Sequence, residues 1–364
     1  MHSKTKKLLT FLLPVQYLGI QMLSFFPALV EKFYSNGVYI YISRALRFTF
    51  GWLPFSFGDI SYIILIGLLL LYIFKIGVKR KVNWQMIAWD AGATCSVIYA
   101  SFHLLWGINY YRMPLHKTLS LEDQYTQEQL ISVTESLIEK ANHIHQLLEQ
   151  NDSVPIHSPY TKDEIFEITK KSYARASLSF PTLKLYPQSI KKSLLSLPLT
   201  YMGFSGYLNP ITNEAQVNSH ILNYRAPTTS CHEQAHQAGY AKENEANFIA
   251  AIITLYDEDL YFRYSGITFA LKFCLNDVYK RDEQIAICLA EKLRPGIREN
   301  YRQINDFWKS YQNPIEPYFK GTYDRYLKIN NQPSGMDSYN YMVALLVNYL
   351  SHQSSQNSRY KNKV

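Results

Sequence analysis

The apolar residues of this 364-residue chain are concentrated in its first 112 positions, in runs long enough to cross a lipid bilayer. A helix needs about 20 mostly apolar residues to span the hydrocarbon core. Tryptophan and tyrosine residues fall near the ends of the runs, as is typical of residues at a membrane interface. We therefore predict a membrane anchor over residues 1–112 with three transmembrane helices, at about 8–30, 56–78 and 86–110.

The remainder of the chain is much more polar. The mean hydropathy of the whole sequence is only -0.17, which excludes a protein made entirely of membrane spans. Three spans without an inverted repeat also argue against a small-molecule permease. A cleaved signal peptide is the alternative for residues 8–30, but two of the predicted spans would then remain.

Basic residues gather at residues 4–7, before the first predicted span, and at residues 75–81, between the second and the third. The positive-inside rule places such clusters in the cytoplasm. We therefore expect a multi-pass protein of the cell membrane whose loop 31–59 and whose chain after residue 111 are extracytoplasmic, although three basic residues in that loop oppose this orientation. A nucleic-acid partner is not expected, because the basic clusters of this chain of net charge +8 flank the spans.

Residues 113–350 have the pattern of a mostly α-helical soluble domain. Two capping boxes, Thr126–Gln129 and Thr161–Glu164, predict helices that end near residues 151 and 176. A last apolar helix is expected over residues 338–350; at this length it is too short to span a membrane. The polar residues 351–364 are predicted to form a flexible tail.

A stretch rich in Gly, Pro and Tyr interrupts the helical pattern. Residues 201–210 and 214–218 alternate in polarity around a turn and predict a small β-hairpin or sheet. An exposed strand edge over residues 203–218 could bind an extended substrate as an added strand. An ordinary structural hairpin explains the same pattern equally well.

The chemistry is concentrated in the motif His232-Glu233-x-x-His236. On a helix, side chains four residues apart share a face, so both imidazoles can reach one Zn²⁺ ion. Zinc lowers the pKa of a bound water toward ~7, and Glu233 can then act as the general base that activates this water against a carbonyl group. A purely structural alternative exists, because Ser230 and Glu233 also have the spacing of a helix capping box.

A catalytic zinc needs a third protein ligand and an open fourth position. Gly239 is expected to end the helix, and Lys242 stands where a metzincin would carry its third histidine. The segment from Glu243 to Asn247 resembles the Glu-x-x-Ala-Asp/Asn element of gluzincin-type metallopeptidases. That resemblance implies Glu243 as the third ligand and Asn247 as a hydrogen-bond partner of a ligand histidine. Glu245 is the alternative ligand; Mn or Co is compatible with the site, but the donor set favours Zn²⁺.

Five segments carry a wider resemblance: Gly203–Gly206, Asn209–Ala215, Pro227–Gly239, Glu243–Phe248 and Ser338–Tyr339. Through them the chain resembles an uncharacterised bacterial membrane family, domain of unknown function 3810, over nearly its whole length. The resemblance implies three N-terminal spans followed by a zincin-like α+β metallopeptidase domain. Asn247 departs from the Asp that many gluzincin relatives carry.

A peptidase also needs a group that stabilises the transition state. Tyr261, Arg263 and Tyr264 follow the zinc motif and are the candidates. The sequence thus predicts a membrane-anchored zinc metallopeptidase with a peptide or protein substrate and unknown oligomeric state. A catalytically silent zinc-binding protein that acts in envelope binding or assembly is the alternative, and in it Glu233→Gln would leave function intact.

Overall fold

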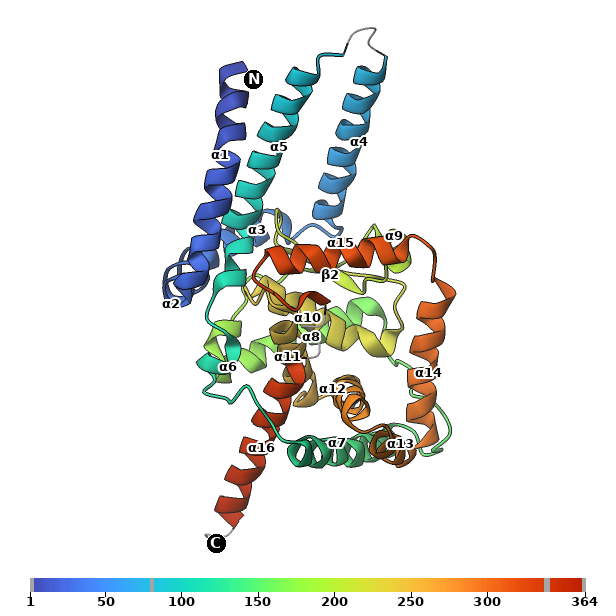
Figure 1. Ribbon diagram of the computed structural model, residues 1–364. Coiled ribbons are helices and arrows are strands. Elements are labelled where there is room, and N and C mark those ends of the chain that lie inside the picture. The colour runs from blue at the N-terminus through green and yellow to red at the C-terminus, as the bar shows by residue number, and fades with distance from the viewer. Residues whose placement is uncertain (1–2, 79–81, 337–340, 362–364) are drawn as a thin grey trace.

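The computed structural model describes residues 3–78, 82–336 and 341–361, and these residues are mostly helical, as predicted (Figure 1). The N-terminal part contains α1 (Ser3–Met22), the 3₁₀ turn η1 (Leu23–Phe25), α2 (Pro27–Leu29), the π-helical segment η2 (Val30–Val38), α3 (Tyr39–Phe50), α4 (Phe57–Gly77), α5 (Trp84–Leu105) and the 3₁₀ turn η3 (Gly107–Tyr111). The rest contains α6 (Leu115–Thr118), α7 (Gln127–Leu148), α8 (Lys162–Ser179), η4 (Pro181–Leu183), β1 (Ile190–Lys192), α9 (Ser196–Met202), β2 (Gly206–Asn209), β3 (Glu214–Val217), η5 (Asn223–Arg225), α10 (Ala226–Gln237), α11 (Glu243–Leu255), α12 (Leu260–Arg281), α13 (Glu283–Glu291), α14 (Pro295–Ser310), α15 (Glu316–Ile329) and α16 (Met342–Lys361).

Helices α1, α4 and α5 project together from one side of the domain formed by the later elements (Figure 1). α1 lies along α5, where the rings of Phe11 and Trp89 have centroids 5.7 Å apart. The start of α1, with Lys4, Lys6 and Lys7, and the end of α4, with Lys75, both lie at the end of this group far from the domain (Figure 1). Of the second cluster, residues 79–81 lie outside the described residues.

The prediction of three spans is corrected to two. Within the described residues, α1 continuing to Phe25 and α4 are the helices long and apolar enough to cross a membrane. The predicted third span forms α5, which is long enough, but Asp90, Ser96 and His103 lower its hydrophobicity. In α4 the consecutive leucines Leu68–Leu71 are 56–60% exposed. Such exposed apolar surface indicates membrane association.

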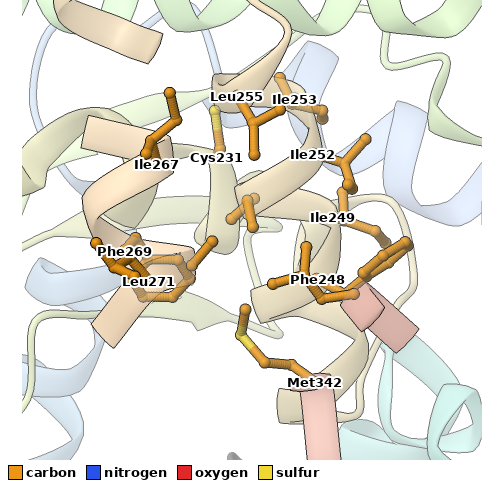
Figure 2. Close-up of a cluster of buried hydrophobic side chains, with 14 of the residues drawn as sticks. Cys231, Phe248, Ile249, Ile252, Ile253, Leu255, Ile267, Phe269, Leu271 and Met342 are labelled. Carbon is orange, nitrogen blue, oxygen red and sulfur yellow. The ribbon is translucent and has the colours of Figure 1, made fainter. Parts of the chain in front are cut away.

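The domain core lies among α10, α11, α12 and α16. Figure 2 shows Cys231 of α10 packed among apolar side chains of α11 and α12, with Met342 of α16 beneath them. One side of α11 consists of apolar residues such as Phe248 and Ile252, both buried in this core. Burial at about 25 cal/mol per Å² of apolar surface holds the two helices that carry the histidine motif and its acidic neighbours in a rigid pair.

The predicted hairpin is present as part of a three-stranded sheet in the order β1-β3-β2. β2 pairs antiparallel with β3, and β1 pairs parallel with β3. Gly203 ends α9 with a φ of 80°, a left-handed conformation that favours glycine, and this turn directs the chain into β2. β2 is an edge strand, because only β3 pairs with it in the part of the chain that the structure describes.

Both capping boxes are present, at Thr126 and at Thr161, and the helices that they begin are α7 and α8. The last helix differs in length from the prediction, since α16 extends from Met342 to Lys361 and includes most of the segment expected to be a tail. The pair Ser338–Tyr339 lies outside the described residues, as do residues 362–364.

The segments next to the N-terminal helices are tied to the end of α10. Tyr39 donates a hydrogen bond to the carbonyl of Gln237 at 2.9 Å, and the indole of Trp106 donates to the carbonyl of His236 at 2.9 Å. Arg112 donates to the carbonyl of Gly239 at 2.9 Å and forms an ion pair with Glu31 at 2.7 Å. These bonds satisfy backbone carbonyls at the C-terminus of α10, which have no partner within the helix.

Candidate metal centre

α10 carries both histidines of the motif on one face. Pro227 occupies the first turn, where its missing N–H costs no helical hydrogen bond. His232 and His236 are one turn apart, and their ring centroids lie 4.6 Å apart with the rings at 88°. Ser230 lies inside the helix, so it is not the residue that caps α10. This excludes the capping-box explanation of Glu233.

The turn after α10 brings the next acidic residue back onto the histidines. Gly239 has a φ of 89° and ends the helix as predicted, and α11 then begins at Glu243. The Oε2 atom of Glu243 lies 3.1 Å from Nε2 of His232 and 3.6 Å from Nε2 of His236. One donor atom from each of these residues lies within 4.8 Å of the other two.

This donor set fits a zinc ion. At Zn–N and Zn–O distances of about 2.0–2.2 Å, tetrahedral ligand atoms are roughly 3.3 Å apart, which lies between the two distances measured from Glu243. Two imidazoles and one carboxylate are also the ligands of a catalytic zinc with one open position. His232, His236 and Glu243 could therefore hold zinc with small side-chain adjustments.

The ring of His236 is held in place by two contacts besides Glu243. Its Nδ1 atom lies 2.7 Å from the carbonyl oxygen of Tyr240, which leaves Nε2 directed at the carboxylate. The ring packs edge-on against Trp106. Burial lowers the pKa of His236, but the carboxylates of Glu243 and Glu233 more than offset this and raise it to about 9.

Glu243 is buried and has its own supporting hydrogen bond. The hydroxyl group of Tyr323 in α15 donates to its Oε1 atom at 2.6 Å. Burial alone would raise the pKa of Glu243, but the two histidines hold it well below its usual value. The carboxylate is therefore ionised, as a metal ligand must be.

The structure separates the roles of the two glutamates and the asparagine of α11. Glu245 points away from the histidines and accepts a hydrogen bond at 2.8 Å from the backbone amide of Leu115. Asn247 lines the same cavity as the histidines and is buried. Its Nδ2 atom has no hydrogen-bond partner among the described residues, so this atom makes no hydrogen bond to His232 or His236.

Glu233 lies beside the cluster of His232, His236 and Glu243, against the sheet. Burial raises its pKa to about 7, although the two neighbouring histidines act in the opposite direction. A Cβ atom on Gly206 of β2 would lie 2.6 Å from Oε1 of Glu233 and 2.6 Å from the carbonyl oxygen of Gln216. Only glycine therefore allows the edge strand to approach Glu233 this closely.

The cluster opens into a cavity of about 930 Å³. Its floor is α10 and α11, and one wall is β2 with the loop before it. α4 contributes Tyr62 and α5 contributes Phe102, so the N-terminal helices form part of the wall. Further aromatic side chains line the cavity: Trp106, Tyr110, Phe204, Tyr207, Phe269, Phe273, Tyr323 and Tyr326.

The three residues predicted to stabilise the transition state are not among the lining residues of this cavity. Tyr264 donates a hydrogen bond to Asn300 at 2.6 Å, and Tyr261 packs against Tyr160. Arg263 donates to the carbonyl of Glu258 at 3.1 Å. α12 thus directs these side chains into other contacts.

Several residues that the structure brings to the site carry no signal in the sequence. Trp106, Tyr323 and Tyr326 come from segments far from the histidine motif, and the 30 tyrosines of the chain make any single tyrosine a weak candidate. Gly206 stands out only as the second glycine of the Gly203–Gly206 segment. Its closeness to Glu233 is a tertiary property.

Comparison with known proteins gives one family. The family model described as "Protein of unknown function (DUF3810)" matches residues 34–347. No curated protein and no solved structure matches the chain. The expectation of a zincin-like domain thus has no support from a solved structure and rests on the histidine motif and its neighbours.

Proposed function

Since the chain belongs to the DUF3810 family, whose description names no activity, we propose a function from the site itself: a membrane-anchored zinc metallopeptidase. The observation that carries the proposal is the convergence of His232, His236 and Glu243 next to the buried carboxyl of Glu233. All four residues line one cavity that is large enough for a peptide segment.

The residues that would hold zinc are His232, His236 and Glu243. Zinc, when bound, supplies a Lewis acid that polarises a carbonyl group and lowers the pKa of water toward ~7. The protein orients two of these three side chains by hydrogen bonds. The Tyr240 carbonyl is bonded to Nδ1 of His236, and the Tyr323 hydroxyl donates to Glu243. Such supporting hydrogen bonds orient ligands and tune their basicity.

Glu233 is proposed as the general base. Its Oε2 atom has no hydrogen-bond partner within the described chain and is therefore available to take a proton from an attacking water. A pKa of about 7 suits a group that must accept this proton and then give it to the leaving amine at neutral pH. Because Gly206 has no side chain, space remains for the carboxyl group of Glu233.

The edge strand β2 is the proposed substrate-binding strand. Gly206, Tyr207 and Leu208 line the cavity, and the outer side of β2 has no partner strand in the described residues. An extended peptide could pair with this edge and place a carbonyl beside Glu233. Backbone pairing of this kind tolerates many side chains.

The transition-state stabiliser is reassigned to the phenols of α15. Tyr323 and Tyr326 both line the cavity, and Tyr326 is hydrogen-bonded to Tyr110 at 3.2 Å. A phenolic O–H can donate to an oxyanion that develops on the substrate carbonyl. We propose Tyr326 for this role, because Tyr323 is already bonded to Glu243.

The position of the cavity supports a substrate close to the membrane. Tyr62 lies near the start of α4 and Phe102 near the end of α5, so the cavity begins where the N-terminal helices meet the domain. The lysines at the start of α1 and at the end of α4 support an extracytoplasmic catalytic domain. We therefore propose that the protein cleaves a peptide segment next to the extracytoplasmic surface of the cell membrane.

Metal content of the purified full-length protein tests the proposal. We expect one zinc per chain in the wild type prepared without chelators, loss of zinc in Glu243→Ala, and retention in Glu233→Gln. Glu245→Gln should keep its zinc, because the Glu245 carboxylate accepts a hydrogen bond from the Leu115 amide instead of facing the histidines. Absence of metal in the wild type would contradict the proposal.

Cleavage of a peptide library by protein in lipid nanodiscs supplies the second test. Wild-type protein should cleave, and Glu233→Gln with zinc bound should be slower by about 10²–10⁴-fold, the usual contribution of a general base. Zinc binding with equal function in wild type and Glu233→Gln would instead favour the catalytically silent zinc protein.

A further inference from the structure

The cavity contains a cationic side chain that the proposed peptide hydrolysis does not use. Arg225 precedes α10 with helical backbone angles (φ -90°, ψ -17°), so it continues the helical path of that element by one residue. Residues 225, 228, 229, 232 and 236 then share a face at 3.6 residues per turn. All five line the cavity with Glu233.

The guanidinium group of Arg225 is paired with no carboxylate among the residues that the structure describes. No carboxylate forms an ion pair with it in the described ranges, and its buried Nη1 atom has no hydrogen-bond partner there. Its Cζ atom lies 4.6 Å from the ring centroid of Phe269, a contact that orients the group but does not neutralise it.

The surroundings of Arg225 add positive charge. Lys272 of α12 lies near Arg225. Burial and the positive charge of Arg225 together lower the pKa of Lys272 to about 8. The other titratable neighbours are Tyr224 and Tyr301, and burial raises the pKa of both, so they are uncharged at neutral pH. The buried Nη1 atom of Arg225 lacks a partner in the described chain, and an unpaired buried polar group is costly, so this end of the cavity favours an anion.

We propose that Arg225 forms an anion-binding subsite of this cavity. The subsite holds a carboxylate or phosphate group of the substrate, separate from the carbonyl group that is cleaved. The seven-residue separation of Arg225 from His232 corresponds to a rise of about 10 Å along the helix. That distance is the length of about three residues of extended peptide. The inference rests on the proposed function in one respect only, namely that the molecule carrying the anion is a peptide substrate.

The subsite also gives the substrate a direction. The C-terminal end of α10, with His236, contacts Trp106 and the membrane-proximal segments, whereas Arg225 lies at the opposite end of the helix. A substrate would therefore place its apolar part beside Tyr62 and Phe102 and its anion at Arg225, away from the N-terminal helices.

The first test uses metal-free, full-length protein in detergent, with inorganic phosphate and acetate as probes at constant ionic strength. Saturable binding should raise the thermal midpoint of the wild type by about 2 °C or more. Arg225→Gln should abolish the shift, and Arg225→Lys should keep part of it. Arg302→Gln is the matched control, because Arg302 is an exposed α14 residue that pairs with Glu299 and Asp306.

The second test uses zinc-loaded protein and hydroxamates that carry a carboxylate, a phosphonate or an uncharged amide about 10 Å from the chelating group. The preferred anion should bind at least about 10-fold more tightly than the amide. This gain should disappear in Arg225→Gln, while binding of the amide compound should stay unchanged. The identity of the better anion distinguishes carboxylate-bearing from phosphate-bearing substrates.

The outcomes separate the two proposals. Phosphate or acetate stabilisation that depends on Arg225, without zinc-dependent hydroxamate binding, would keep the subsite and contradict the metallopeptidase. Hydroxamate binding without any gain from the anion would keep the metallopeptidase and overturn the subsite. A wild type that neither anion stabilises would also overturn the subsite, whether or not the Arg225 variants fold.

Discussion

The hydroxyl group of Tyr323 donates a hydrogen bond to Oε1 of Glu243 at 2.6 Å, although the two residues are 80 positions apart in the chain. The same carboxylate presents Oε2 to both histidines. α15 thereby holds the third donor of the candidate metal centre from the side opposite to α10. The position of Glu243 thus depends on a helix that the histidine motif does not reveal.

Tyr323→Phe is expected to weaken zinc binding by about 10–100-fold, the usual effect of removing a hydrogen bond behind a metal ligand. The substitution keeps the ring, which packs against Phe204 and Tyr326, so the fold should be retained. Competition with a chromophoric chelator measures the affinity. Tyr318→Phe on the exposed side of α15 is the control, and an unchanged affinity in Tyr323→Phe would contradict the role given to the hydroxyl.

Gly206→Ala should impair catalysis without removing the metal. The added Cβ would lie 2.6 Å from Oε1 of Glu233, so the carboxyl group or the strand must move. A displacement of about 1 Å at a reacting group can cost on the order of 10²-fold in rate. We expect kcat to fall by roughly that factor while zinc content stays at one per chain. Loss of zinc with intact stability would show that Gly206 acts on the ligands instead.

The metal-free protein should become less stable as the pH rises through the titration range of Glu233. Burial raises the pKa of this carboxyl from 4.5 to about 7. A group whose pKa is raised by folding stabilises the folded state fully below its unfolded pKa, and this contribution is lost as the pH rises through the folded value. The free energy of unfolding should therefore fall between about pH 4.5 and 7 relative to Glu233→Gln.

Denaturant unfolding of both proteins after chelator treatment measures this difference. Only the difference between wild type and Glu233→Gln is diagnostic, because other groups titrate in the same window. Parallel curves for the two proteins from pH 4 to 8 would show that Glu233 is not held in a perturbed environment.

Asp59→Ala should loosen the attachment of α4 to the domain. The buried carboxylate of Asp59 accepts hydrogen bonds from Ser193 Oγ at 2.9 Å, from the amide of Leu194 at 2.7 Å and from the hydroxyl of Tyr207. Hydrogen bonds to a charged group are worth about 1.5–3 kcal/mol each, and their loss would leave buried donors unpaired. We expect a destabilisation of about 3 kcal/mol or more, measured by unfolding in detergent.

The control for this variant is Asp163→Ala. Asp163 is exposed and pairs with Lys192 at the surface, so its loss should change stability by less than about 0.5 kcal/mol. Equal effects of the two substitutions would show that the Asp59 network does not hold α4 in place.

The local features of the chain follow from its sequence because their physical causes act over a few residues. The four-residue spacing of His232 and His236 places both rings on one helix face whatever the rest of the chain does. Gly239 ends the helix because it adopts a left-handed conformation at low cost. Thr126 and Thr161 cap their helices through hydrogen bonds to residues three positions later.

The apolar composition of the N-terminal region predicts its long helices but overestimates the number of membrane spans. α5 has the length of a transmembrane helix, but Asp90 and His103 make it less apolar than α4. α1 packs along this helix, which sequence runs of apolar residues do not reveal.

Tertiary structure decided which distant residues meet the histidines. Tyr261, Arg263 and Tyr264 are close in sequence to the motif, but α12 directs them to Tyr160, the Glu258 carbonyl and Asn300. The cavity wall is instead built by α15, β2 and the N-terminal helices.

The sequence by itself therefore determined the ligand motif, its helix and the turn that follows, since these depend on backbone geometry over about a dozen residues. Only the folded chain decided that Glu243 and not Glu245 faces the histidines and that Tyr323 supports it. It also decided that Arg225 shares the cavity with no carboxylate partner in the described part of the chain. The physical reason is that packing of separate helices against one core sets these contacts, and such packing depends on the whole set of buried side chains.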